Sequence, residues 1–329
     1  MYIILIIFSG TEGRSIITYD QFKTDLLKRL KPMFPSSIVE IIDVTKNNDT
    51  TYEAVTIHTN NQKISPCIRL QSYYDDFIHS KKYASIMDVV ISMLDTLQYH
   101  MPSRITSHTH LDDITNFSAV RNRIIFRLVN RSMNSALLRK LASTDFMDEF
   151  VLTYSVVVDQ NDKELASIRI TTSLIKLWGI SLEELYSIAL ENTMRLFPIS
   201  SFRMEEMFSH LLGEPLPTPE DNRTMMYVLS NQIGINGATV LVYPNVLKEF
   251  VSKYNLPHKH LHILPSSIHE IILVPSDNLS ITDKLLQMVH EVNETQVAQD
   301  ELLSDNILIY DCINSSLHLC RDGECHDQC

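Results

Sequence analysis

Hydrophobic and polar positions follow two different periods along the first hundred residues. Between residues 18 and 30, and again between 83 and 100, apolar side chains recur every three or four positions, which predicts amphipathic helices. Two runs rich in isoleucine, valine and threonine lie between them, separated by Asn47, Asn48 and Asp49, and this arrangement predicts a β-hairpin. The predicted elements are a helix that begins at a Thr18–Gln21 capping box, strands at 38–45, 51–58 and 66–70, and a helix at 83–100.

A polar stretch, 102–118, interrupts this pattern and is interpreted as a linker to a second unit. Beyond it, strand and helix patterns mix without regular alternation. This favours an α+β fold, with mixed, mostly antiparallel sheets and packed helices in two units, over a doubly wound parallel sheet. The predicted strands are 121–130, 150–158, 164–171, 225–230, 238–243, 261–264, 270–274 and 306–311. The predicted helices are 137–141, 201–212, 280–292 and those beginning at Ser181 and Pro244.

The chain is therefore divided into five expected parts. They are an apolar N-terminal extension at 1–17, an α+β unit at 18–101, the linker, a larger α+β unit at 119–312, and a tail rich in cysteine and histidine at 313–329.

The composition narrows the classes of protein without selecting one. Hydrophobic residues make up 44% and charged residues 21%, as in ordinary globular proteins. Seven glycines are few for 329 residues, which argues against a glycine-rich nucleotide cradle. The formal net charge of −12 opposes binding of the whole chain to anionic polymers or surfaces. Nucleic acid and membrane are accordingly not the expected partners.

Neither end of the sequence has the pattern of a secretory signal or of a membrane span. Met1–Phe8 is almost entirely apolar, but it lacks the positive start and the cleavage site of a secretory signal, and it is too short to span a bilayer. Four of the five cysteines lie in 312–329, whereas a disulfide-stapled domain would distribute them. These features favour a cytoplasmic protein.

The segment Pro265–Glu270 carries the first candidate chemistry. Its candidate catalytic residues are Ser266, Ser267, His269 and Glu270. In a hydrolase or metal-dependent enzyme, a serine would be the nucleophile, His269 its base, and Glu270 an assisting carboxylate or ligand. However, a nucleophile and its base on one turn rarely align, because triads are assembled from distant segments. Serines after a proline also make good turn residues, so a structural turn is favoured.

His258, His260 and His262 alternate along a predicted strand, which would place three imidazoles on one face. Imidazoles are zinc ligands, but same-face neighbours on a strand lie roughly 6.5–7 Å apart, which is wide for one ion bound at about 2 Å. Leu261 and Ile263 would occupy the opposite face. The histidine face is therefore expected to be the solvated side of the strand.

The tail holds a second set of possible metal ligands. These are His318, Cys320, Cys325, His326 and Cys329, with Cys312 nearby. They are enough for one tetrahedral zinc ion, but the paired Cys-x2-Cys spacing of established zinc modules is absent. No cofactor is expected, with zinc in the tail as the alternative. Because chain ends fray, removal of 313–329 is expected to leave the fold intact.

A basic window provides the candidate anion site. Residues 114–144 contain no acidic side chain, and a strand at 121–130 would direct several arginines to one face. Those arginines are Arg121, Arg123, Arg127 and Arg131. Guanidinium groups bind phosphate and carboxylate through a fixed fork of donors. The expected partner is an acidic protein surface or a phosphate-bearing ligand; the alternative is pairing with Asp145, Asp148 or Asp159 across the sheet.

Several stretches of the chain carry a family resemblance. The most specific is Leu261–Pro275, and the others are Ser173–Pro198, Met226–Phe250, Asn293, Leu303–Asp305, Lys46–Asn48, Ile64–Leu70 and Tyr73–Tyr74. They resemble the bacterial domain-of-unknown-function family 5688. The resemblance covers roughly residues 18 to 311 and leaves out the apolar start and the tail. It also departs at 141–146, where the family tends to have a Pro-His pair that this chain lacks. The resemblance implies a bacterial, cytoplasmic protein and no particular activity.

The sequence thus favours a non-enzymatic binding or regulatory protein. No phosphate-binding loop, dinucleotide fingerprint or HExxH motif is present. The alternatives are a hydrolase or metal-dependent enzyme that uses Ser266, His269 and Glu270, and a binder of anions or nucleic acid that uses the face from Arg121 to Arg131.

Overall fold

The computed structural model describes residues 17–59, 67–79, 82–100, 114–160, 165–206 and 225–321. The chain forms two compact units, one from Met1–Val44 with Thr51–Leu111 and the other from Thr45–Thr50 with Asp112–Cys329. The predicted extension, apart from Ile17, and residues 102–113 of the predicted linker lie outside the described residues. The six residues Thr45–Thr50 form the turn of a hairpin whose strands belong to the first unit, yet they group with the second.

The first unit packs helices against a three-stranded sheet of order β1-β2-β3. Its elements are α1 (Tyr19–Leu30), η1 (Lys31–Met33), β1 (Ser37–Thr45), β2 (Thr51–Thr59), β3 (Cys67–Arg69), α2 (Leu70–Ile78) and α3 (Ile86–His100). The predicted capping box is confirmed, since the Thr18 hydroxyl accepts from the Gln21 amide and the Gln21 side chain accepts from the Thr18 amide. Phe22, Leu26 and Val90 are fully buried in its core.

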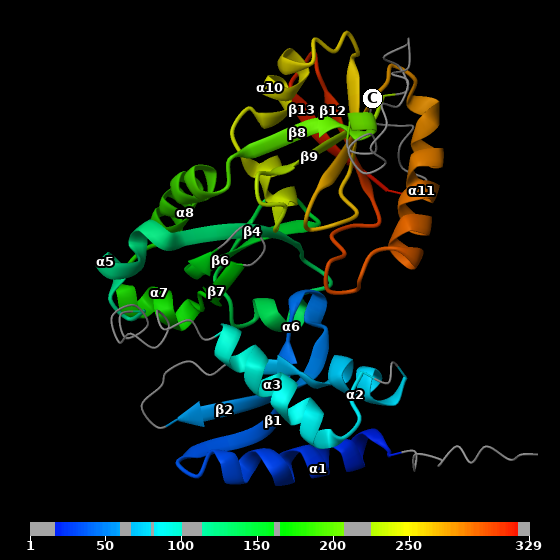
Figure 1. The fold of residues 1–329 in the computed structure, drawn as a ribbon. Coiled ribbons are helices and arrows are strands. Elements are labelled where there is room, and N and C mark those ends of the chain that lie inside the picture. Colours follow the sequence, from blue (N-terminus) through cyan, green and yellow to red (C-terminus); the bar gives the residue numbers. More distant parts are fainter. Residues whose placement is uncertain are drawn as a thin grey trace, which may run out of the picture. The chain divides into compact units, whose positions relative to one another are not determined.

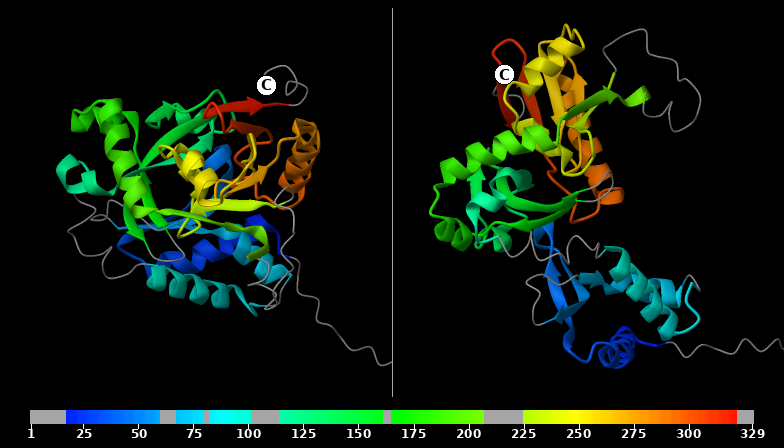
Figure 2. Two further views of the ribbon diagram at one scale, coloured as in Figure 1. Left: turned by 90° about the horizontal axis from the view of Figure 1, so that it is seen from above. Right: turned by 60° about the vertical axis from the view of Figure 1, so that its left-hand side comes forward.

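The second unit contains two separate sheets, which Figure 2 shows from two sides. The four-stranded sheet consists of β4 (Ile124–Asn130), β5 (Ser143–Asp145), β6 (Phe150–Gln160) and β7 (Leu165–Arg169), with β6 in the centre. The six-stranded sheet has the order β13-β12-β10-β11-β9-β8, with β8 (Ile199–Arg203), β9 (Tyr227–Asn231), β10 (His260–Leu264), β11 (Ile271–Pro275), β12 (Ile307–Asp311) and β13 (Ser316–Cys320). Every strand pairing within these two sheets of the described chain is antiparallel, so the predicted α+β class is confirmed.

Helices complete the second unit (Figure 1). They are α5 (Phe117–Val120), η3 (Arg121–Arg123), α6 (Ser135–Leu138), α7 (Thr172–Trp178), α8 (Leu182–Leu196), η5 (Gly237–Val242), α10 (Val246–Lys253), η6 (Leu279–Ile281) and α11 (Thr282–Thr295). Together with η5, the two sheets bury one continuous apolar core that includes Phe126, Tyr154 and Ile263. Within the described residues, no helix is both long enough and apolar enough to cross a membrane.

Strand β4 lies at the edge of its sheet, and side chains satisfy its outward backbone amides. The Phe126 amide donates to the Thr193 hydroxyl of α8, and the Leu128 amide donates to the Thr239 hydroxyl of η5, both at 3.1 Å. Unpaired amides of an edge strand are costly to bury, so these hydroxyls allow β4 to lie inside the core. They also connect the four-stranded sheet to the elements that carry the other one.

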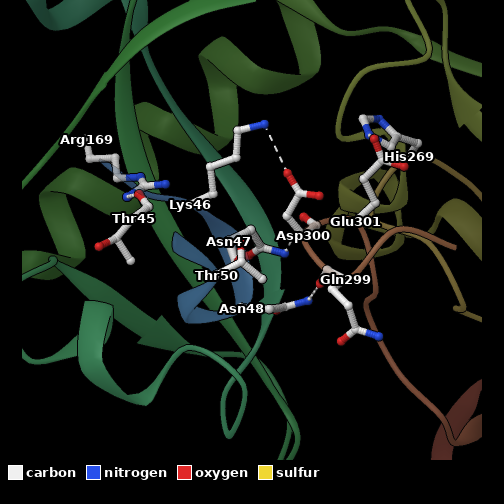
Figure 3. Close-up of polar contacts among 10 residues, drawn as sticks. All are labelled: Thr45, Lys46, Asn47, Asn48, Thr50, Arg169, His269, Gln299, Asp300 and Glu301. Atoms are coloured by element: carbon white, nitrogen blue, oxygen red, sulfur yellow. Dashed lines mark hydrogen bonds and ion pairs between the residues drawn. The ribbon is translucent and has the colours of Figure 1, made fainter. Parts of the chain in front are cut away.

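The hairpin turn η2 (Asn47–Asp49) is held by side-chain amides (Figure 3). The Asn48 amide nitrogen Nδ2 donates to the carbonyl oxygens of Gln299 at 2.8 Å and Leu302 at 2.6 Å. Asn48 and Asn134 also bond reciprocally, each at 2.9 Å, and Lys46 forms a 3.0 Å ion pair with Asp300. These contacts explain why the turn groups with the second unit.

Two residues of this turn have left-handed backbone conformations. Asn48 has φ = 58° and Asp49 has φ = 50°, a region that asparagine and aspartate tolerate better than other non-glycine residues. The conformation directs the Asp49 carboxylate to the amides of Ala136 at 2.7 Å and Leu137 at 3.0 Å, at the start of α6. The turn thus caps a short helix, with Asp49 bonding an amide that lies 87 residues later in the chain.

Three predicted elements of the second unit are wrong in type or extent. Residues 237–242 form the 3₁₀ helix η5 instead of a strand at 238–243. The run is short, apolar and buried on all sides, so its hydrophobic pattern does not distinguish a helix from a strand. Of the predicted helix at 201–212, residues 201–203 belong to strand β8 (Ile199–Arg203), residues 204–206 are helical, and residues 207–212 lie outside the described residues. Strand β4 begins at Ile124, three residues later than predicted, after η3.

The predicted solvated face of the histidine strand is also wrong. His262 is fully buried and its imidazole contacts the Thr282 hydroxyl at 3.2 Å, because α11 covers that face of the six-stranded sheet. Burial, with a smaller contribution from the neighbouring His260, lowers the pKa of His262 to about 4. In contrast, the predicted strand, tight connection and strand at 261–275 are confirmed in β10 and β11.

Deletion of residues 313–329 is expected to destabilise the second unit, contrary to the expectation from the sequence. The deletion removes β13, which pairs with β12 from Ile307 to Asp311 and buries Cys320. A loss of about 2 kcal/mol would lower the melting temperature by roughly 4–8 °C. A chain that ends at Arg321 is the control, because it keeps β13. Equal melting temperatures of the two shortened chains would contradict a stabilising role of this strand.

Substitution of Asn48 should separate its hydrogen bonds from its backbone conformation. Asn48→Gly tolerates the left-handed backbone but removes three side-chain bonds, and is expected to cost about 2–4 kcal/mol. Asn48→Ala removes the same bonds and adds strain of about 1 kcal/mol at positive φ. Thermal unfolding of the full chain measures both, and a harmless Asn48→Gly substitution would show that the side chain contributes little.

Acid should destabilise the protein partly through His262. Its pKa in the folded chain, about 4, lies below the value of about 6.5 for an unfolded histidine. Protons therefore bind preferentially to the unfolded chain, and stability is lost as the pH falls from 6.5 towards 4, by up to roughly 3 kcal/mol. His262→Gln is expected to lose this part of the pH dependence in denaturant unfolding. His318→Gln, on exposed β13, should keep it, and identical slopes for both variants would disprove the assignment.

Candidate functional site

The segment Ser266–Glu270 forms a bonded corner between β10 and β11. The Ser267 hydroxyl accepts from the His269 amide at 3.0 Å, and Ser267 also forms a β-bridge with Leu302. The Ser266 carbonyl accepts from the Leu303 amide at 2.9 Å. No hydrogen bond joins either serine hydroxyl to the His269 imidazole in this described segment. The bond of Ser267 to its own turn is the arrangement that the structural interpretation anticipated, although Ser267 makes it instead of Ser266.

His269 and its neighbours form a small charged group (Figure 3). The imidazole Nδ1 lies 3.2 Å from the Gly234 carbonyl oxygen and 3.3 Å from the Asn236 amide nitrogen, while Nε2 lies 3.6 Å from a Glu301 carboxylate oxygen. Burial raises the pKa of Glu270, which His269 and the Ser267 hydroxyl oppose by stabilising its carboxylate. These contacts hold the loop before η5 in place. The His269 imidazole could act as a base, but no nucleophile lies next to it among the described residues.

Gly237 explains why this corner packs so closely. A β-carbon at this position would lie 1.9 Å from the Ser230 hydroxyl oxygen and 2.2 Å from the His269 carbonyl oxygen. The Ser230 hydroxyl donates to that same carbonyl at 2.7 Å. The glycine therefore admits a backbone contact between the loop before η5 and the Ser266–Glu270 corner that no other residue allows.

The four predicted arginines do not form one array. Arg121 and Arg123 lie in η3, before the strand, and only Arg127 lies within β4. Arg123 donates to the Val157 carbonyl at 3.1 Å. Arg131 pairs with Asp145 at 2.8 Å and donates to the Asp148 carbonyl at 3.1 Å, which is the intramolecular pairing considered as the alternative. The exposed Arg121 lies apart from Arg127.

Strand pairing gives Arg127 a different neighbour. Arg127 lies opposite Thr153 of β6, and Arg169 of β7 lies opposite Ser155 of the same strand. Residues directly opposite each other in antiparallel strands share a face, so the two arginines flank Thr153 and Ser155 on one face of the sheet. We call these four residues the arginine face. All of them belong to the second unit.

The electrostatics of Arg127 are unusual. Its Nε donates to the Thr153 hydroxyl at a long 3.4 Å, and the described residues provide no ion pair for it. Burial and, to a smaller extent, the charge of Arg169 together lower the pKa of Arg127 to about 10. A partly buried cation near another cation costs free energy unless an anion compensates it. Arg169 itself donates to the Thr45 carbonyl at 3.0 Å (Figure 3).

Ser155 adds an unsatisfied polar atom to this face. Its side chain is 3% exposed, and its buried hydroxyl oxygen has no hydrogen-bond partner. Thr153, two residues earlier on β6, is also 3% exposed. Buried hydroxyl groups are nearly always bonded, so the unpartnered Ser155 hydroxyl on the same face of the sheet as two arginines is unusual.

The predicted metal ligands are only partly within the described residues. His318 and Cys320 lie in β13, whereas Cys325, His326 and Cys329 lie outside the described chain. Cys320 is disulfide-bonded, so its sulfur is occupied. Among the residues that the structure describes, no three His, Cys, Asp or Glu side chains meet as metal ligands would. This includes His258, His260 and His262.

Arg169 and Ser155 were not among the residues predicted from the sequence. The pattern at 150–171 predicted a hairpin, and a register drawn through its turn would have placed Arg169 beside β6. However, a register shift between Val157 and Asp159 changes which residues lie opposite each other. The partner of Arg127 therefore depended on an irregularity that the sequence does not reveal.

Comparisons with known proteins identify a family without an assigned activity. No curated protein and no solved structure gives a significant match to the chain. A family model described as a family of unknown function matches residues 19–312, which include both units and every element from α1 to β12. The chain therefore belongs to the family of unknown function DUF5688.

Proposed function

We propose that this protein is a non-enzymatic binding protein that recognises an anionic group through the arginine face. The observation that carries the proposal is the environment of Arg127. It is a partly buried guanidinium, and the charged neighbour that shifts its pKa is Arg169, another cation. Isolated buried charges are strongly unfavourable, and a bound anion would supply the missing counter-charge.

A hydrolytic role for the Ser266–Glu270 corner is less well supported. A catalytic serine needs a base within hydrogen-bond reach, and here the Ser267 hydroxyl is engaged by the amide of its own turn. The raised pKa of Glu270 has burial as its main cause, which is common in structural carboxylates too. The corner is better explained as the contact that fixes η5 through Gly237.

We further propose a bacterial, cytoplasmic setting. The resemblance to a bacterial family supports it, as does the Cys312 thiol, which takes part in no disulfide. The disulfide at Cys320 argues in the other direction, since glutathione and thioredoxin keep cytoplasmic thiols reduced.

Substitution of Arg127 tests the proposed function through stability. Arg127→Met removes a buried charge but keeps an apolar stem, so the variant without ligand is expected to be as stable as the parent or more stable. Anionic ligands should raise the melting temperature of the parent and leave that of Arg127→Met unchanged, because only a binding-competent chain is stabilised by mass action.

Arg121→Met is the matched control. It makes the same change in net charge at an exposed site, and it should respond to anions as the parent does. A large loss of stability in ligand-free Arg127→Met would show that the arginine is structural. An equal response of the parent and Arg127→Met to every anion would also reject the proposed site.

A further inference from the structure

The arginine face has too few exposed cations in a row to bind an extended polyanion. A nucleic-acid backbone or acidic protein surface needs several exposed cations in a row. Here Arg123 and Arg131 are already bonded within the chain, to the Val157 carbonyl and to Asp145. The residues that remain beside Arg127 on this face are Thr153 and Ser155 of β6 and Arg169 of β7. They belong to two successive same-face pairs of the sheet, in which Arg127 lies opposite Thr153 and Ser155 lies opposite Arg169.

The hydroxyl donors of the arginine face lie below the protein surface. Thr153 and Ser155 are each 3% exposed, and the flanking Val129 and Val151 of the same face are also buried. Arg127, in contrast, is only partly buried. A flat surface or a polymer backbone would not reach these atoms, whereas a single small group would.

The donors also come from different directions. Arg127 lies on β4, Ser155 in the centre on β6 and Arg169 on β7, so three neighbouring strands contribute. The Thr153 hydroxyl accepts from Arg127 and retains its own hydrogen as a donor. A planar carboxylate is satisfied by one guanidinium fork in its plane, but a phosphate presents three terminal oxygens in three directions.

We infer that the arginine face binds one small tetrahedral oxyanion, the phosphate group of a small molecule, with Arg127 and the Ser155 hydroxyl as its central donors. The inference rests on the proposed anion binding and narrows it to a ligand class. Arg127 supplies the charge that phosphate requires, and Ser155 gains the partner that its buried hydroxyl lacks.

Calorimetric titration of the full chain tests this assignment. The probes are inorganic phosphate, phenyl phosphate, sulfate, acetate and a single-stranded oligonucleotide, each in low and high salt. We expect phosphate and sulfate to bind with one site per chain, and acetate to bind at least tenfold more weakly. Tighter binding of phenyl phosphate than of inorganic phosphate would identify a phosphate on a larger molecule as the ligand, and the reverse order would identify free phosphate.

Ser155→Ala provides the test of geometry. Because its hydroxyl is unpartnered, the variant should fold with unchanged stability and bind phosphate at least fivefold more weakly. Ser167→Ala is the matched control, since Ser167 is an exposed serine on the same sheet, opposite Val157. It should bind phosphate as the parent does.

The outcomes distinguish the inference of a phosphate ligand from the proposed binding of anions in general. Tight binding of the oligonucleotide without binding of phosphate, or equal binding of acetate and phosphate, would overturn the inference and leave anion recognition intact. Unchanged phosphate affinity in Ser155→Ala would also overturn it. If none of the five probes binds, the proposed function falls together with the inference.

Discussion

The buried edge of β4 is the constraint on which the second unit depends. An edge strand within an apolar core has outward amides that water cannot reach, and each needs an acceptor. Thr193 on α8 and Thr239 on η5 provide these acceptors at Phe126 and Leu128. Thr193 lies on the helix beside the four-stranded sheet, and Thr239 lies among residues that contact the six-stranded sheet. The two bonds therefore connect β4 to elements that pack on each sheet.

The same strand has two faces with opposite chemistry. Phe126 and Leu128 point into the shared core, while Arg127 between them points to the other side of the sheet. Since the threonine contacts fix the backbone of β4, they also fix the position from which the Arg127 side chain extends on the opposite face. The core thereby sets which strand neighbours Arg127 can reach, among them Thr153 of β6.

The sequence predicted local features better than long-range ones. The Thr18–Gln21 capping box, the hairpin around Asn47 and the strands β10 and β11 depend on neighbouring residues, and they were predicted close to their observed bounds. The helix η5 and the burial of His262 depend on distant segments that cover an apolar run or a polar face. The arginine face shows the same limit: the basic window indicated Arg127, but its neighbour lies across two strands, beyond a register shift.

The hairpin turn around Asn48 has a consequence for synthesis of the chain. Asn48 and its acceptors at Gln299 and Leu302 are separated by 251 and 254 residues. At roughly 5–20 residues per second, the ribosome adds the last acceptor tens of seconds after it has added the turn. During that interval Asn48 lacks these two acceptors, although its other partner, Asn134, has already been translated. The two bonds to Gln299 and Leu302 can therefore form only after nearly the whole chain has been made.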